Sequence, residues 1–176
     1  MFHYFITSFL TFPGVMVHEL AHRLGCAFFG VRVRRAVYFR FGNPLGFIEH
    51  DVPRTYFAHF WISSAPLFLN TILEIGIAYL LIARPYHLVL WQVIVLGWLA
   101  FSLGTHAIPS DGDIKNILHV TRHPKSFFGF FAGLIMFPIV GIVWVADKLK
   151  LFGFEIVYAL LVFGAVVYYL NYLHHL

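Results

Sequence analysis

The sequence predicts an all-α polytopic membrane protein with five to six transmembrane helices and a small β-hairpin between the first two. Hydrophobic residues make up 60% of the 176 residues and charged residues only 11%, whereas soluble domains carry about 25% charged residues. Five apolar stretches come close to the 20 or so helical residues that a hydrocarbon core requires. They run roughly over residues 3–29, 55–82, 86–107, 126–146 and 152–173. A sixth, shorter helix is predicted after Ser110.

Three prolines lie inside these stretches, namely Pro13, Pro66 and Pro138. Proline interrupts the hydrogen bonding of a helix, and membrane helices tolerate it as a kink or local unwinding beside polar surfaces. No polar, Pro-rich or Ser-rich stretch is long enough to link two domains. We therefore expect a single integral membrane domain over residues 1–176, with a core of roughly 1–120 and accessory C-terminal helices over 121–176.

The segment between the first two stretches has a different pattern. Residues 31–34 alternate between valine and arginine, and residues 37–41 are mostly β-branched or aromatic. Residues 42–46 contain Gly, Asn and Pro, which favour a turn. The pattern predicts a β-hairpin over residues 31–49 at the membrane surface. The alternative interpretation is an irregular basic loop that only sets the orientation of the chain.

A short polar motif interrupts the first apolar stretch. His18 and His22 are one helical turn apart, and Glu19 lies beside them. Positions i and i+4 share a helix face, so both imidazoles can bind one ion at about 2.0–2.1 Å while Glu19 lies next to the open coordination position. Ionisable groups at such depth are costly unless they serve an ion, a partner or a cavity. The motif therefore predicts a zinc site at which Glu19 is the catalytic general base for a water molecule.

A catalytic zinc ion normally has three protein ligands, so this motif needs one more. The inner end of the third stretch carries the richest further set of donors, namely His106, Ser110, Asp111 and Asp113. Ser110 is a good N-cap, and one aspartate could turn toward the ion as a new helix begins. Asp111 and Asp113 point about 200° apart on a helix, so we expect only one of them to bind. The residues alone leave this choice open, and both acids could instead simply cap the helix. His106 is a competing ligand or a supporting donor.

Basic residues gather in the connections between the apolar stretches. Two connections hold most of them: Arg32, Arg34, Arg35, Arg40, Arg54, Lys115, Arg122 and Lys125. The opposite side holds only Arg84, Lys148 and Lys150. Because cytoplasmic connections carry the excess of Lys and Arg, we expect a multi-pass cell-membrane protein with its N-terminus outside and its active site toward the cytoplasmic side. The net charge of +4 then reflects topology, and nucleic acid is not expected as a partner.

Together these residues resemble the site-2 protease family of intramembrane zinc metalloproteases, over roughly residues 14–120. In that family a His-Glu-x-x-His helix is followed by a surface β-hairpin, a helix with a Gly-Pro-x-x-Asn element, and a segment ending in Asp-Gly that supplies the third ligand. The matching positions here are His18, Glu19 and His22, residues 31–49, residues 65–70, and Asp111 with Gly112. The order of the four elements agrees with the family.

The chain departs from the family pattern at three points. Ala65 replaces the glycine, Asn70 lies one residue further from Pro66, and the asparagine-rich approach to the aspartate is missing. The chain is similar to a divergent, archaeal-type branch, whose His-Ala-aromatic-Pro-Ser-x-x-Asp pattern would make Asp113 the ligand and keep His106 nearby. The resemblance also implies that Asn70 steadies substrate backbone or an oxyanion. An interhelical hydrogen bond of about 0.6 kcal/mol is the alternative role for Asn70.

These features predict a zinc-dependent endopeptidase with one catalytic Zn²⁺, which hydrolyses peptide bonds of membrane proteins within or near the lipid bilayer. Its partners would be a membrane protein substrate and the bilayer itself. The same zinc and water could instead hydrolyse a lipid or another small amide or ester. A non-catalytic membrane scaffold is the third interpretation. Glu19 argues against a scaffold, because a protein without turnover needs no general base.

Overall fold

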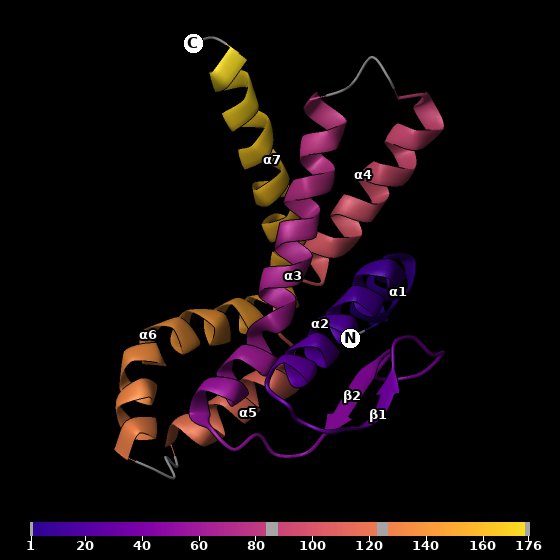
Figure 1. Cartoon of the computed structure of the whole chain (residues 1–176). Helices are drawn as coiled ribbons and strands as arrows, with labels where there is room; N and C mark the ends of the chain where they lie inside the picture. The colour runs from indigo at the N-terminus through magenta and orange to yellow at the C-terminus, as the bar shows by residue number, and fades with distance from the viewer. Residues whose placement is uncertain (1, 84–87, 123–126, 175–176) are drawn as a thin grey trace.

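The computed structural model describes residues 2–83, 88–122 and 127–174, and it is mostly helical (Figure 1). The elements in chain order are α1 (Phe2–Leu10), α2 (Phe12–Phe28), β1 (Val33–Val37), β2 (Phe47–His50), α3 (Tyr56–Ala83), α4 (Leu90–Thr105), α5 (Asp111–Arg122), α6 (Phe127–Leu149), the 3₁₀ turn η2 (Lys150–Phe152) and α7 (Phe154–His174). The predicted helical class and the position of the hairpin are confirmed. Arg84 and Lys125, which support the predicted topology, lie outside the described residues.

Three helical segments of the described chain are long and apolar enough to cross a membrane, judged by length and composition. They are Tyr56–Ala83, Gly129–Phe152 and Phe154–Leu173. The helix α4 is apolar but has only 16 residues, and α2 has 17. The count of five to six spans therefore stays a prediction.

The first predicted stretch is divided into two helices at Thr11. Pro13 explains the break, because it has no N–H and its ring clashes with the carbonyl four residues earlier. Proline is tolerated in the first turn of a helix, which is its position in α2. The Thr11 hydroxyl donates to the Thr7 carbonyl at 2.7 Å, and it lies 2.8 Å from Nε2 of His106. The break is therefore a point where the end of α4 contacts the N-terminal helices.

The strands β1 and β2 pair in antiparallel fashion, with Val37 opposite Phe47 and a bulge between Val33 and Arg35. Residues 38–46 connect them and come close to α2. At Gly46 a Cβ atom would lie 2.7 Å from Cγ of Glu19, so a larger residue would not fit there. The hairpin loop therefore covers one side of the polar motif on α2.

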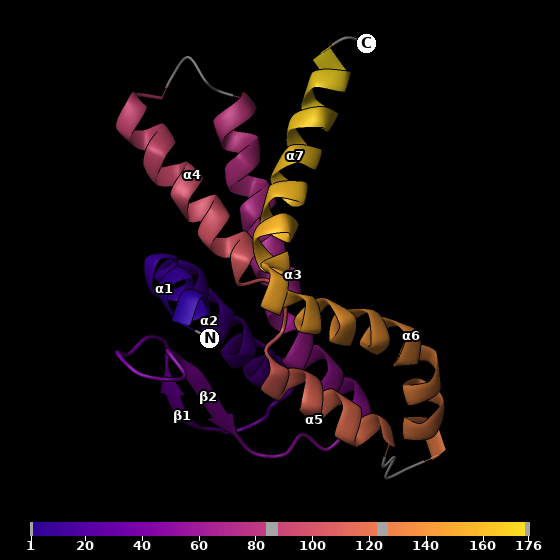
Figure 2. The ribbon, with the colours of Figure 1, turned by 180° about the vertical axis from the view of Figure 1, so that it is seen from behind.

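Helix α3 is the long element that the other helices pack against. Figures 1 and 2 show α5 and α6 near its first half and α4 and α7 along its second half, with α6 changing direction along its length. A buried cluster of Tyr56, Phe60, Ile117 and Val140 joins α3, α5 and α6. This cluster fixes α5 against α3, so it also places the first turn of α5 near α2.

Candidate metal centre

The polar motif of α2 is buried where α2 packs against α3 and α4. His18, Glu19 and His22 are 9%, 8% and 5% exposed. Ionisable side chains are rarely buried to this extent unless they are paired or coordinate an ion. The hydrogen bonds and charges around the three side chains therefore show whether they could bind an ion.

Backbone carbonyls orient both imidazoles. His18 donates from Nδ1 to the carbonyl of His106 at 2.8 Å, and His22 donates from Nδ1 to the carbonyl of Ile62 at 2.8 Å. A carbonyl oxygen can only accept, so each Nδ1 carries a proton, and Nε2 is the ring nitrogen left to present a lone pair when the ring is neutral. Metal-binding histidines in proteins are commonly held in this way, with the second ring nitrogen hydrogen-bonded.

Asp113 meets the two imidazoles. Its Oδ2 lies 3.7 Å from Nε2 of His18 and 3.4 Å from Nε2 of His22, and the two Nε2 atoms are 3.2 Å apart. Two ligands bound at about 2.0–2.1 Å in tetrahedral geometry lie about 3.3 Å from each other, so these three atoms fit three corners of a tetrahedral site. Three electron-pair donors this close repel one another unless protons or a cation lie between them. The group could therefore hold a metal ion.

A capping interaction at the start of α5 fixes the carboxylate of Asp113. Ser110 donates to Oδ2 from its backbone N–H at 2.9 Å and from its hydroxyl at 2.5 Å, and the N–H of Asp113 donates back to that hydroxyl at 3.3 Å. Burial raises the pKa of the Asp113 carboxyl, but without a metal ion the two imidazoles can carry a proton at Nε2, and attraction to His22 and hydrogen bonds from His18 and His22 then more than offset the effect of burial. The pKa of Asp113 therefore lies well below its usual range, and the group is ionised, as a metal ligand must be.

Asp111 belongs to a different, exposed set of contacts. Its carboxylate lies 2.5 Å from Nζ of Lys115 and 2.9 Å from Nζ of Lys148. Hydrogen bonds from Lys115 and then Lys148 hold the pKa of Asp111 below its ordinary value. Of the two aspartates that the sequence left open, the structure brings Asp113 to the histidines and pairs Asp111 with lysines.

Asn70 links three helices. Its Nδ2 donates to the carbonyls of Gly14 at 3.3 Å and Leu103 at 3.2 Å, which joins α3 to α2 and α4. The side chain is fully buried. These contacts give Asn70 the interhelical role, whereas its Oδ1 has no hydrogen-bond partner among the described residues, so a contact with substrate stays a prediction.

His106 supports the site through its backbone. Its carbonyl orients His18, while its ring nitrogen Nε2 lies against Thr11. The carbonyl of Ile62 does the same for His22, and the sequence reasoning missed it. Ile62 is an apolar residue in a long helix, and no sequence pattern indicates that its carbonyl will accept a hydrogen bond from a distant histidine.

Glu19 lies beside the group formed by His18, His22 and Asp113 and interacts electrostatically with all three. The hairpin loop comes close to it at Gly46, where a Cβ atom would lie 2.7 Å from Cγ of Glu19. A carboxylate next to a metal site, but outside the ligand set, is placed to exchange protons with a water molecule or a leaving group there.

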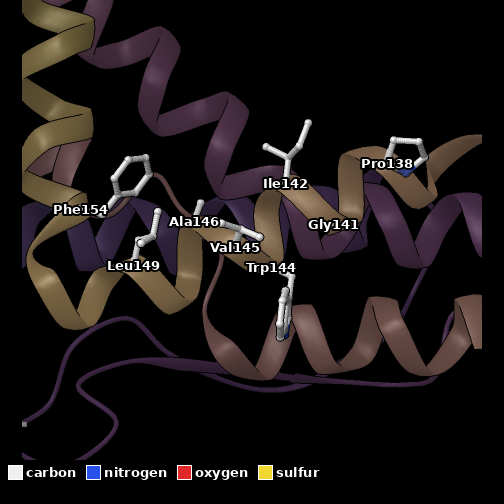
Figure 3. A pocket seen from close by; sticks show the side chains of 8 residues that line it. All are labelled: Pro138, Gly141, Ile142, Trp144, Val145, Ala146, Leu149 and Phe154. Atoms are coloured by element: carbon white, nitrogen blue, oxygen red, sulfur yellow. The ribbon is translucent and has the colours of Figure 1, made fainter.

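The pocket drawn in Figure 3 is separate from this group. It has a volume of about 550 Å³. Its lining residues are Pro138, Gly141, Ile142, Trp144, Val145, Ala146, Leu149 and Phe154. None of these side chains is a metal ligand or an acid, so this hollow does not offer hydrolytic chemistry.

A comparison of the chain with protein-family models, with curated proteins and with solved structures found no match. The residues and geometry of the His18, His22 and Asp113 group therefore carry the functional inference.

Proposed function

We propose that the chain is a zinc-dependent endopeptidase, similar to the site-2 proteases, which cuts peptide bonds of membrane proteins within or near the bilayer. The observation that carries this proposal is the triangle formed by Nε2 of His18, Nε2 of His22 and Oδ2 of Asp113, with edges of 3.2, 3.4 and 3.7 Å. Two imidazoles and a carboxylate are a donor set of hydrolytic zinc sites. The same set also binds Fe(II) in oxygenases, but the adjacent Glu19 favours hydrolysis.

The proposed mechanism assigns a separate task to each residue. His18, His22 and Asp113 would hold the ion with one position left open. When bound, zinc polarises a carbonyl group and lowers the pKa of water to about 7. Glu19 would accept the proton of the attacking water and deliver it to the leaving amine. The hydrogen bonds from Nδ1 to backbone carbonyls would keep both imidazoles in the tautomer that binds metal throughout the reaction.

The fold supports a peptide substrate in two ways. Helix α3, which packs against α2, is long and apolar enough to cross a membrane, so a substrate helix could approach the site within the bilayer. A substrate helix must unwind before attack because its amides are hydrogen-bonded internally. Among the described residues, each strand of the two-stranded sheet also has one edge that pairs with no further strand, and this edge could receive the unwound chain as an additional strand.

The experiment that tests this proposal uses purified full-length protein, zinc and a model transmembrane peptide. The parent should cleave the peptide and bind one zinc ion per chain. Glu19→Gln should lower the cleavage rate by about 10²-fold or more, the range for removal of a general base, while the zinc content stays the same. His18→Ala should lose both metal and cleavage.

Glu74→Gln is the matched control, because Glu74 is also a buried glutamate and lies outside the group that could hold a metal ion. This variant should cleave at the rate of the parent. Loss of zinc from Glu19→Gln would show that Glu19 is not the general base assigned here. A parent that binds zinc but does not cut the peptide would contradict the endopeptidase activity.

A further inference from the structure

Residues 106–110 connect α4 to α5 and hold two parts of the metal centre. At one end the carbonyl of His106 orients His18. At the other end Ser110 caps α5 and fixes Asp113. The middle of this linker is buried and has no regular secondary structure. Its carbonyl groups therefore need hydrogen-bond donors from elsewhere in the chain.

Lys150 supplies these donors from the turn η2, 42 residues after Ile108. Its Nζ donates to the carbonyl of Ile108 at 3.1 Å and to the carbonyl of Pro109 at 2.8 Å. Oδ1 of Asp147 lies 3.4 Å from the same nitrogen, so each of the three ammonium hydrogens has an acceptor. The Lys150 side chain is only 12% exposed, and a charge so deeply placed is stable only when it is paired in this manner.

We propose that Lys150 is a positioning residue of the metal centre. It holds the linker so that the His106 carbonyl faces His18 and the Asp113 carboxylate faces both histidines, and its charge adds an electrostatic attraction to Asp113. This inference rests on the metal site proposed above. It implies that the C-terminal helices, which the sequence presents as accessory, contribute to the geometry of the site.

Lys148 provides the matched contrast. It lies two residues before Lys150, its side chain is 48% exposed, and its ion pairs are with Asp111 and Asp147. Its described contacts are therefore with carboxylates and not with the carbonyls of the linker. Exposed ion pairs of this kind contribute little to structure.

The test compares the metal affinity of full-length variants in the same detergent. Co²⁺ is titrated by its absorption spectrum, and Zn²⁺ is measured by competition with a chelator. Lys150→Met keeps an apolar chain of similar length without donors, and its affinity should fall about 10–100-fold, as when a group that orients a ligand is removed. Lys150→Arg should recover most of the affinity because it keeps the charge and the donors. Lys148→Met should stay within about twofold of the parent.

Thermal unfolding of the metal-free proteins separates positioning from folding. A purely structural role would lower the Tm of Lys150→Met and leave the affinity of the folded protein unchanged, and that result would overturn the proposal. Should Lys150→Met fail to fold, Lys150→Gln keeps the position polar and should show a loss of at least about tenfold. A parent that binds Co²⁺ no better than His18→Ala would refute the metal centre itself, whereas a binding parent with unaffected Lys150 variants refutes only the role of Lys150.

Discussion

Replacing Gly14 with alanine would test whether the contact between α2 and α4 sets the geometry of the metal centre. A Cβ atom at position 14 would lie 1.9 Å from the carbonyl oxygen of Ser102 and 2.8 Å from Cδ2 of His106. Ordinary van der Waals contact begins near 3.4 Å, so the two helices must separate by about 1.5 Å. The nearest obstacle is backbone, so a side-chain rotation cannot relieve the clash.

This separation would break two direct hydrogen bonds between the described residues of α2 and the end of α4. The N–H of Gly14 donates to Oγ of Ser102 at 2.7 Å, and Nδ1 of His18 donates to the carbonyl of His106 at 2.8 Å. Overpacking costs about 1–3 kcal/mol, and each lost hydrogen bond about 0.5–1.5 kcal/mol. We expect the free energy of unfolding to fall by about 2–6 kcal/mol. The metal affinity should fall about tenfold or more, because His18 loses the group that orients it.

Chemical unfolding in detergent, followed by tryptophan fluorescence, would measure the stability, and a Co²⁺ titration would measure the affinity. Gly97→Ala is the control, because it lies on α4 and a Cβ atom there would meet nothing within 4 Å. Alanine is the better helix former, so this control should be neutral or slightly stabilising. If Gly14→Ala behaves like Gly97→Ala in both measurements, the contact between α2 and α4 does not set the site.

Three further variants address the proposed ligand set and the buried acid of α3. Asp113→Asn should weaken Zn²⁺ binding on the order of 100-fold, because a neutral amide replaces an ionised ligand, whereas Asp111→Asn should stay within about twofold. Competition with a chelator measures both, and equal losses would contradict the assignment of Asp113. Glu74 is fully buried, and neither of its carboxyl oxygens has a hydrogen-bond partner among the described residues. Glu74→Gln should therefore have an equal or higher Tm, and a clearly lower Tm would show that the carboxyl group has a stabilising partner.

The parts of the site that the sequence predicts are those set by local spacing. His18 and His22 share a helix face because they are four residues apart, and Ser110 caps α5 because it precedes the helix directly. The sequence could not choose between Asp111 and Asp113, because spacing shows only that they point apart. The packing of α5 against α3 decides which of them faces α2, and that packing depends on buried side chains from distant parts of the chain.

Two features of the fold involve contacts between distant parts of the chain in addition to local sequence. From the sequence we predict a kink within a single long helix near Pro13, because this proline lies within an unbroken apolar run, whereas the structure has a break at Thr11. The structure places the end of α4 against this break through His106. From the sequence Lys150 is predicted only to be a charge at the end of a membrane helix. Its structural role is not visible there, because the carbonyls to which it donates lie 42 and 41 residues earlier.

The orientation of the two histidines depends on nearby glycines in the sequence more than on the identity of the residues whose carbonyls hold the imidazoles. Both orienting groups are backbone carbonyls, so any side chain could stand at those positions. The positions that let these carbonyls approach tolerate fewer residue types, because they require glycine. Gly14 lies one turn before His18 and allows α4 to come close. Gly25 lies three residues after His22 and allows α3 to come close, because a Cβ atom at position 25 would lie 3.2 Å from Cα of Ile62. A larger residue at Gly14 would displace α4, and one at Gly25 would require α3 to give by a few tenths of an ångström, so the close spacing of the helices keeps both carbonyls in place against the imidazoles.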